Sequence, residues 1–324
     1  KSLLNMHAPG SPFKILVGLS ALQEKAITEK TSIYCNNYYQ YGKEKRKMQC
    51  HCGGGYRNLS NALSLSCNSY FANAYRKTID TKSPTKEAFD NWSNQMKSFG
   101  LGEYLNNDLS VGKKGIIPDF DFYDKWYPDF KWGATTTLSN SIGQGEVLVT
   151  PIQLANMTAA IANKGYYYTP HIIKKIEGSE IDSKFKTKNY TLIDSTHFEP
   201  IIEGLSKVYK SGTAQFLQVP EIEICGKTGT AENFTKINGK KTQLTDHSIF
   251  VAFAPKDNPT IAISVLVENG YYGSRWAGRI ASLMIEKYIK GEVTLKNMEQ
   301  LVMNKSLDEE YQKPFLDKPF KINQ

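Results

Sequence analysis

Residues 225–230 read Cys-Gly-Lys-Thr-Gly-Thr, and two apolar runs follow: Ser-Ile-Phe-Val-Ala-Phe-Ala over 248–254 and Thr-Ile-Ala-Ile-Ser-Val-Leu-Val over 260–267. Runs that are rich in β-branched and aromatic residues and bounded by turn residues are typical of strands. Neighbouring strands with short connections pair antiparallel. The last third of the chain therefore predicts an antiparallel sheet, closed by an amphipathic helix over 277–289.

Helical patterns precede these strands. Apolar residues recur at helical spacing over 13–22, behind Ser11 as helix N-cap and Pro12 at the first helical position. Helices gathered against an antiparallel sheet make an α+β domain. We therefore expect an antiparallel β-sheet flanked by helices, with an adjoining all-helical subdomain. The other expected segments are short helices near 59–63 and 70–74, surface loops with short helices over 79–135, and a helix over 151–163.

Composition limits the class of protein. The 324 residues are 40% hydrophobic and 22% charged, which is typical of a folded chain with a real core. No run of apolar residues is long enough to cross a membrane, and the chain begins at Lys, which suggests a fragment of a longer precursor. The formal charge is +8, but no zinc-finger, helix-turn-helix or aromatic RNA-binding signature accompanies it, so nucleic acid is not an expected partner.

Ser11-Pro12-Phe13-Lys14 is an S-x-x-K tetrad at the start of the first expected helix. Residues three apart in a helical turn share a face, so the Lys14 amine can reach the Ser11 hydroxyl. Burial and the positive end of a helix both favour a neutral amine, which could deprotonate the serine. Ser11 is therefore a candidate nucleophile and Lys14 its candidate base. The tetrad alone is a weak signal, because it recurs elsewhere in the chain.

Two further motifs distinguish this tetrad from its copies. Ser66-Cys67-Asn68 is the only S-x-N triplet, and Lys227-Thr228-Gly229 is the only K-T-G. An S-x-x-K at a helix start, an S-x-N between helices and a K-T-G on a strand, in this order, form the signature of penicillin-recognising serine acyltransferases.

On these motifs the chain resembles the transpeptidase domain of class B penicillin-binding proteins, in particular the penicillin-binding protein 2 group of the cell-elongation machinery. The likeness spans most of residues 5–290. We expect a transpeptidase domain over 1–290, helical and loop-rich over about 26–215 and sheet-containing over about 216–290, with a polar, loosely attached tail over 291–324. The family's sheet has strands well upstream of the serine, and this chain begins ten residues before it. The other residues that carry the likeness are 8–10, 99–102, 142–145, 150–155, 230–232 and 247–255.

The resemblance implies a peptidoglycan D,D-transpeptidase. In that reaction the penultimate D-alanine of a stem peptide acylates Ser11, the terminal D-alanine leaves, and an amine of a neighbouring stem takes the acyl group. Ser66 would relay a proton to the leaving amine, and Asn68 would bind the substrate backbone. The reaction cross-links stem peptides during cell-wall elongation, and β-lactams inhibit it covalently.

The resemblance also implies roles for the residues of the K-T-G strand. Lys227 would sustain a positive field, while Thr228 and Thr230 would offer hydroxyls to a substrate carboxylate. Gly229 would keep the strand edge open to an extended peptide. The backbone N–H groups of Ser11 and Thr230 would form the oxyanion hole.

The resemblance further implies partners and a place in the cell. The partners are peptidoglycan stem peptides, β-lactam antibiotics and, for the full-length protein, the membrane glycosyltransferase and scaffold of the elongation machinery. The expected location is the periplasmic face of the bacterial inner membrane, with an anchor in an N-terminal segment outside this chain.

Two rival functions share these motifs. A serine β-lactamase adds a carboxylate that activates water, and Glu103 and Asn107 stand in a suitable order for one; we interpret Glu103 as surface charge, because its surroundings resemble an ordinary transpeptidase loop. A non-catalytic β-lactam sensor is the second rival, since the same pocket could bind ligand and signal to a partner.

Four of the five cysteines lie close together in sequence, at 35, 50, 52 and 67, with His51 between two of them. Such a cluster indicates either structural zinc or a pair of disulfides, Cys35–Cys50 and Cys52–Cys67. The resemblance favours zinc, because some members of the penicillin-binding protein 2 group carry it near the active site. The matching ligands are Cys35, Cys50, Cys52 and Cys67, with the choice between His51 and Cys52 left open. Cys225 is interpreted as a small buried strand residue.

Overall fold

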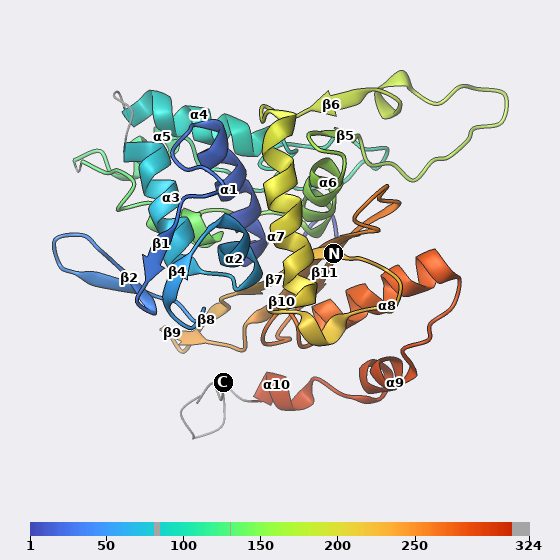
Figure 1. The fold of residues 1–324 in the computed structure, drawn as a ribbon. Coiled ribbons are helices and arrows are strands. Elements are labelled where there is room, and N and C mark those ends of the chain that lie inside the picture. The colour runs from blue at the N-terminus through green and yellow to red at the C-terminus, as the bar shows by residue number, and fades with distance from the viewer. Residues whose placement is uncertain (81–84, 130, 313–324) are drawn as a thin grey trace.

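Three antiparallel strands form the central sheet, as the sequence predicts. They are β7 (Cys225–Ala231), β10 (His247–Ala254) and β11 (Ile261–Val267), in the order β11-β10-β7. The computed structural model describes residues 1–80, 85–129 and 131–312 (Figure 1). Within these ranges β7 pairs with β10 alone, so its other edge carries no strand of this sheet.

Both faces of the sheet are buried, which explains why β10 is apolar at every position from 249 to 254. Alternate side chains of β10 point to opposite faces. Helix α8 (Ala277–Lys290) contacts β10 and β11 and covers the face of the smaller core. In β10, Ile249, Val251 and Phe253 belong to the larger core, and Phe250, Ala252 and Ala254 to the smaller one.

The larger core surrounds α1 (Lys14–Gln23), whose residues are buried from Lys14 to Leu22. Helices α2, α3, α4 and α7 all contact it, and α6 packs against β10 and β11. α1 therefore lies at the centre of the helical part, where its N-terminus is held near the sheet. These helices are α2 (Leu59–Ser64), α3 (Asn68–Asp80), α4 (Thr85–Lys97), α6 (Pro151–Ala162) and α7 (Phe198–Lys210), with α5 (Phe120–Trp126) beside α4.

Small two-stranded sheets form the periphery. The β2–β3 hairpin projects from the molecule, and β1 pairs with β4 near the start of α3 (Figure 1). They are β1 (Ile33–Cys35), β4 (Gly55–Arg57), β2 (Tyr38–Tyr41), β3 (Arg46–Gln49), β5 (Tyr166–Tyr168), β6 (Lys188–Tyr190), β8 (Phe234–Ile237) and β9 (Lys240–Gln243).

The structure corrects two local expectations. Residues 79–135 contain α4, thirteen residues long, whose Phe89, Trp92 and Met96 are fully or almost fully buried at helical spacing. Ser11 is not a helix N-cap, because it is the first residue of the 3-10 helix Ser11–Phe13, whose N-cap is Gly10; its hydroxyl accepts a hydrogen bond from Ser66 instead.

The C-terminal segment is more firmly attached than its composition suggests. α9 (Lys296–Asn304) and α10 (Asp308–Gln312) follow α8, and Glu310 is only 2% exposed. Its carboxylate pairs with Arg275 at 2.5 Å, and its carbonyl accepts a hydrogen bond from Thr245. The expected polar tail is therefore held at Met298, which packs against the smaller core, and at Glu310, while 313–324 lie outside the described residues. None of the helices described here has the length and apolar character that crossing a membrane requires.

Candidate active site

The nucleophile candidate lies in a chain of three polar side chains. Ser66 Oγ donates to Ser11 Oγ at 2.9 Å, and Lys14 Nζ donates to Ser66 Oγ at 3.1 Å. Lys14 also donates to the Ser66 carbonyl at 2.8 Å and to Asn68 Oδ1 at 2.5 Å. S-x-x-K and S-x-N thus meet although more than fifty positions separate them. The described contacts connect Lys14 to Ser11 through Ser66 rather than directly.

The environment of Lys14 makes its amine easier to deprotonate than that of an ordinary lysine. The side chain is fully buried, and burial lowers the pKa of its amine to about 8, against an opposing effect of the Cys50 and Cys67 thiols. Among the described residues no carboxylate forms an ion pair with it. An amine with this pKa is charged in a large fraction of molecules at neutral pH yet can release its proton at little cost.

Ser66 owes its position to an unusual backbone conformation. It lies between α2 and α3 with φ 55°, a left-handed conformation that non-glycine residues seldom adopt. The preceding helix ends at Ser64, and the next begins at Asn68, so the bend turns both side chains toward Lys14. Strain of this kind is often found at functional sites.

The K-T-G motif lies on the edge strand β7. Lys227 is fully buried and donates to the Thr228 carbonyl at 3.3 Å, and the Thr228 hydroxyl lies 2.9 Å from the Thr213 hydroxyl. Burial, followed by the charge of Lys14, lowers the pKa of Lys227 well below its usual range. Because a neutral amine carries no charge, this direction opposes the positive field that the resemblance implies for Lys227.

Two glycines bring the nucleophile turn against β7. Gly10 has φ 61° and ψ −147°, a conformation that only glycine adopts readily, and a Cβ there would lie 2.5 Å from the Thr230 carbonyl oxygen. A Cβ on Gly229 would lie 2.5 Å from Pro12 Cδ. The absence of a side chain at Gly229 therefore lets Pro12 pack against the strand. This role differs from the expected one, in which Gly229 keeps the strand edge open to a peptide.

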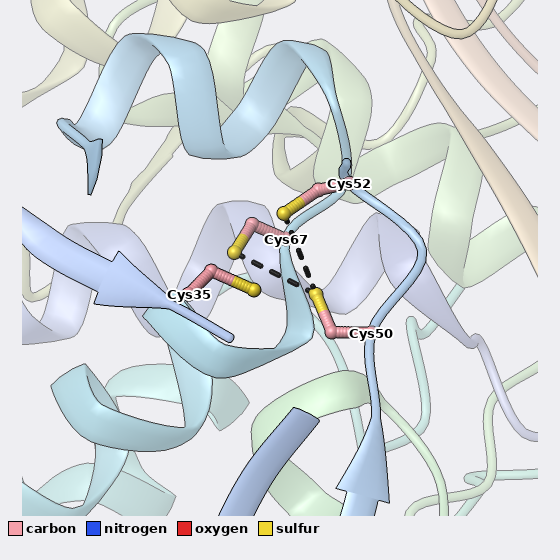
Figure 2. A group of neighbouring side chains, drawn as sticks. All are labelled: Cys35, Cys50, Cys52 and Cys67. Carbon is pink, nitrogen blue, oxygen red and sulfur yellow. Dashed lines mark hydrogen bonds between the residues drawn. The ribbon is translucent and has the colours of Figure 1, made fainter. Parts of the chain in front are cut away.

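The four clustered cysteines meet beside this site (Figure 2). Their sulfur atoms all lie within 4.8 Å of one another, and all four side chains are buried. Cys50 Sγ lies 3.6 Å from Cys52 Sγ and 3.7 Å from Cys67 Sγ. In a tetrahedral site with Zn–S bonds of about 2.3 Å, neighbouring sulfurs are about 3.8 Å apart. The four thiols therefore fit a tetrahedral zinc ion.

The alternatives fit the geometry less well. All five cysteines are free thiols, so neither expected disulfide is present. His51 is exposed and lies outside the cluster, whereas Cys52 is within it. Cys225 is buried in β7, as expected, and its thiol contacts the Ile202 carbonyl.

The cysteine cluster is tied directly to Asn68. Asn68 N–H donates to Cys50 Sγ at 3.1 Å, and Asn68 Nδ2 donates to the Gln49 carbonyl at 2.7 Å. Cys67, in the middle of S-x-N, belongs to the cluster itself. The loop that carries Cys50 thus fixes both the backbone and the amide of Asn68.

Three contact residues were missed from the sequence. The Gln49 carbonyl and Thr213 belong to no motif, so their roles depend on tertiary contacts alone. Gln144, whose Nε2 donates to the Thr230 carbonyl at 3.1 Å, lies in the family-like segment 142–145, and this was the only available signal. The rival carboxylate Glu103 has an exposed side chain, in line with its interpretation as surface charge.

Comparison with known proteins identifies the family. The family model described as penicillin binding protein transpeptidase domain matches residues 3–286. The chain belongs to the penicillin-binding protein transpeptidase family. The α+β fold expected from the sequence is thereby confirmed, together with the resemblance to the penicillin-binding protein 2 type.

The relatives of this transpeptidase domain are longer proteins. Peptidoglycan D,D-transpeptidase MrdA of Acinetobacter baumannii is 29% identical over 289 residues, covering 84% of this chain and 41% of the relative. The MrdA protein of Haemophilus influenzae is 30% identical over 300 residues, covering 87% and 44%. The chain therefore spans less than half the length of these curated relatives.

Solved structures support the same fold. Pseudomonas aeruginosa PBP2 in complex with WCK 5153 matches with a TM-score of 0.75 and 29% identity, covering 91% of this chain and 64% of that one. PBP2 of Helicobacter pylori in complex with MreC matches with a TM-score of 0.72 and 28% identity, covering 90% and 51%.

We expect Gly10→Ala to destabilise this transpeptidase domain. The new Cβ would meet the Thr230 carbonyl, and the backbone strain alone costs about 1–3 kcal/mol. Thermal unfolding measures the loss. Gly239→Ala is the matched control, because Gly239 also has positive φ (78°) but no heavy atom within 4 Å of the new Cβ. An equal loss in both variants would contradict close packing of the nucleophile turn on β7.

Proposed function

We propose that this domain is the acyl-serine catalytic domain of a peptidoglycan D,D-transpeptidase of the cell-elongation type. The observation that carries the proposal is the hydrogen-bonded chain from Lys14 through Ser66 to Ser11, beside the K-T-G edge strand. The names of the MrdA relatives support it.

Acylation begins with transfer of the Ser11 proton. Ser66 lies within hydrogen-bond distance of both Ser11 and Lys14, so the proton can pass from Ser11 to a neutral Lys14 through the Ser66 hydroxyl. Ser11 Oγ then bonds to the carbonyl carbon of the penultimate D-alanine, and the carbonyl oxygen takes up negative charge. The backbone N–H groups of Ser11 and Thr230 would stabilise that charge.

Collapse of the tetrahedral intermediate breaks the C–N bond to the terminal D-alanine. The leaving nitrogen receives the proton held by Lys14, again through Ser66, and departs as an amine. An amine of a second stem peptide then repeats these steps in reverse and loses its own proton to the same pair. The acyl group ends on the new nitrogen, and Ser11 and Lys14 return to their initial states.

A zinc ion held by Cys35, Cys50, Cys52 and Cys67 is part of the proposal. Bound zinc would supply structural cross-linking of the 35–67 segment rather than chemistry at the reacting carbonyl. The fit of the four thiols supports this assignment, as does the pair of contacts from Asn68 to Gln49 and Cys50. The cluster would hold the Asn68 side chain, which is expected to bind the substrate backbone, in place.

The whole protein would work at the periplasmic face of the inner membrane with partners of the elongation machinery. The H. pylori PBP2–MreC complex and a neighbour described as a peptidoglycan synthase complex that coordinates polymerization and crosslinking support this part of the proposal. Stem peptides would be the substrates and β-lactams the covalent inhibitors.

The function is tested by intact mass spectrometry with benzylpenicillin. We expect one stable adduct per chain, mapped to Ser11, and none in Ser11→Ala. Ser110→Ala is the matched control, because Ser110 begins another S-x-x-K tetrad but is exposed. Sustained hydrolysis of the drug would instead indicate a β-lactamase. An adduct without D-alanine release or transfer from a stem peptide, assayed with the membrane partner present, would indicate a sensor.

The acylation rate should rise with pH through about 8. The reactive form of Lys14 is the neutral amine, which predominates above its pKa of about 8, so the rate should increase about tenfold per unit below that value and level off above it. The thiols of Cys50, Cys67 and Cys52 are the other titratable groups that influence the pKa of Lys14, and Lys14 in turn lowers the pKa of Lys227. Stopped-flow acylation by a chromogenic β-lactam measures the profile, and a flat profile from pH 6.5 to 9 would contradict this role.

Removal of zinc should lower stability and acylation together. Without the metal, the loop that holds Asn68 loses its cross-link, so the melting temperature and the acylation rate at Ser11 should fall in parallel. Metal analysis verifies the zinc content. Cys35→Ser should lose the metal, and Cys225→Ala should retain it because Cys225 lies outside the cluster. Unchanged acylation in verified metal-free protein would defeat the proposal.

A further inference from the structure

The free edge of β7 presents both backbone groups of Thr230. In an antiparallel ladder, alternate residues point their N–H and C=O toward the partner strand and away from it. The Thr230 carbonyl accepts a hydrogen bond from a side chain outside the sheet, and the N–H of a residue in an antiparallel ladder points to the same side as its carbonyl, so both groups face away from β10. A Cβ on Gly10 would lie 2.5 Å from Thr230 O, so the nucleophile turn is next to them. Thr230 therefore offers one donor and one acceptor beside Ser11.

This pair of groups matches the acyl donor that the proposed function requires. A residue pairing with Thr230 as in an antiparallel ladder places its carbonyl at the Thr230 N–H and its own N–H at the Thr230 carbonyl. For a stem peptide, that residue is the penultimate D-alanine, whose carbonyl Ser11 attacks. The Thr230 carbonyl is then the acceptor for the amide N–H on the donor side of the scissile bond.

In the free protein that acceptor already has a donor. Gln144 Nε2 lies 3.1 Å from the Thr230 carbonyl oxygen, and the contact joins positions 86 apart in sequence. The segment that carries Gln144 is held close by, because Gly10 N–H donates to the Gly143 carbonyl at 2.8 Å. The Gln144 carboxamide therefore already satisfies the carbonyl to which a substrate N–H would bind.

We propose that Gln144 is a specificity-determining residue whose carboxamide must be displaced from the Thr230 carbonyl by the amide N–H of the acyl donor. The inference rests on the proposed acyl-serine function. An acyl donor with this N–H exchanges one hydrogen bond for another. A donor without it gains nothing at Thr230, so Gln144 affects the two kinds of donor differently.

Two β-lactams distinguish the two kinds of donor. Benzylpenicillin carries an acylamino N–H on the carbon next to its reactive carbonyl, whereas the carbapenem imipenem carries a hydroxyethyl group there and has no such N–H. The measured quantity is the ratio of their second-order acylation rate constants at Ser11. Gln144→Met keeps the side-chain length and removes the side-chain N–H that competes for the Thr230 carbonyl. We expect the ratio of benzylpenicillin to imipenem to rise about threefold to tenfold, the effect of one hydrogen bond.

Controls separate this effect from general damage. Gln40→Met changes an exposed glutamine in β2 and should leave the ratio at its wild-type value. Gln144→Ala also removes the carboxamide and serves as a second variant if methionine disturbs the fold. The melting temperature measures any such disturbance. An unchanged or lowered ratio in both Gln144 variants would overturn the inference while Ser11 acylation by either drug still supports the proposed function. Absence of labelling by both drugs in the wild type would overturn both.

Discussion

A buried lysine to which the described residues offer no carboxylate partner is the constraint on which the rest of this structure depends. Lys14 is fully buried, and all its hydrogen bonds in the described part of the chain go to Ser66 and Asn68. Burying an amine is costly unless its donors are satisfied or its proton is lost. The left-handed bend at Ser66 brings the acceptors of the Lys14 amine into place, namely the Ser66 hydroxyl, the Ser66 carbonyl and the Asn68 side-chain oxygen. The groups that satisfy the amine are thus the same groups that connect it to Ser11.

That bend in turn needs support from outside the helices. Asn68 begins α3, and the first N–H groups of a helix have no partner within it. The Cys50 thiol accepts the Asn68 N–H, and the Gln49 carbonyl holds the Asn68 amide, which leaves its oxygen for Lys14. The cysteine cluster is therefore connected through Asn68 to Lys14 and Ser66.

The motifs made the fold class and most of the site predictable from the sequence. The strand pattern predicted β7, β10 and β11 nearly to the residue. The order of S-x-x-K, S-x-N and K-T-G selected Ser11 among several tetrads, and the structure brings Ser11 together with Ser66 and Lys14. The prediction of surface loops over 79–135, which rested on composition, is wrong for α4, because the aromatic residues there are buried on a helix. Composition failed again at Glu310, since pairing with Arg275 is a tertiary contact. The Gln49 carbonyl was unpredictable for a further reason: a backbone acceptor has no sequence signal.

The edge of β7 shows how a sheet edge can remain accessible to a peptide and still be protected from pairing with a strand of another protein. A bare edge is a hazard, because its free N–H and C=O groups can pair with any exposed strand. Here the turn at Gly10 and Pro12 packs against Gly229 and Thr230, and Gln144 occupies the Thr230 carbonyl. What remains is a short length of edge whose groups are partly satisfied and lie next to Ser11. An incoming strand must match that length and replace the contact of Gln144, so protection of the edge and selection of the acyl donor follow from the same arrangement.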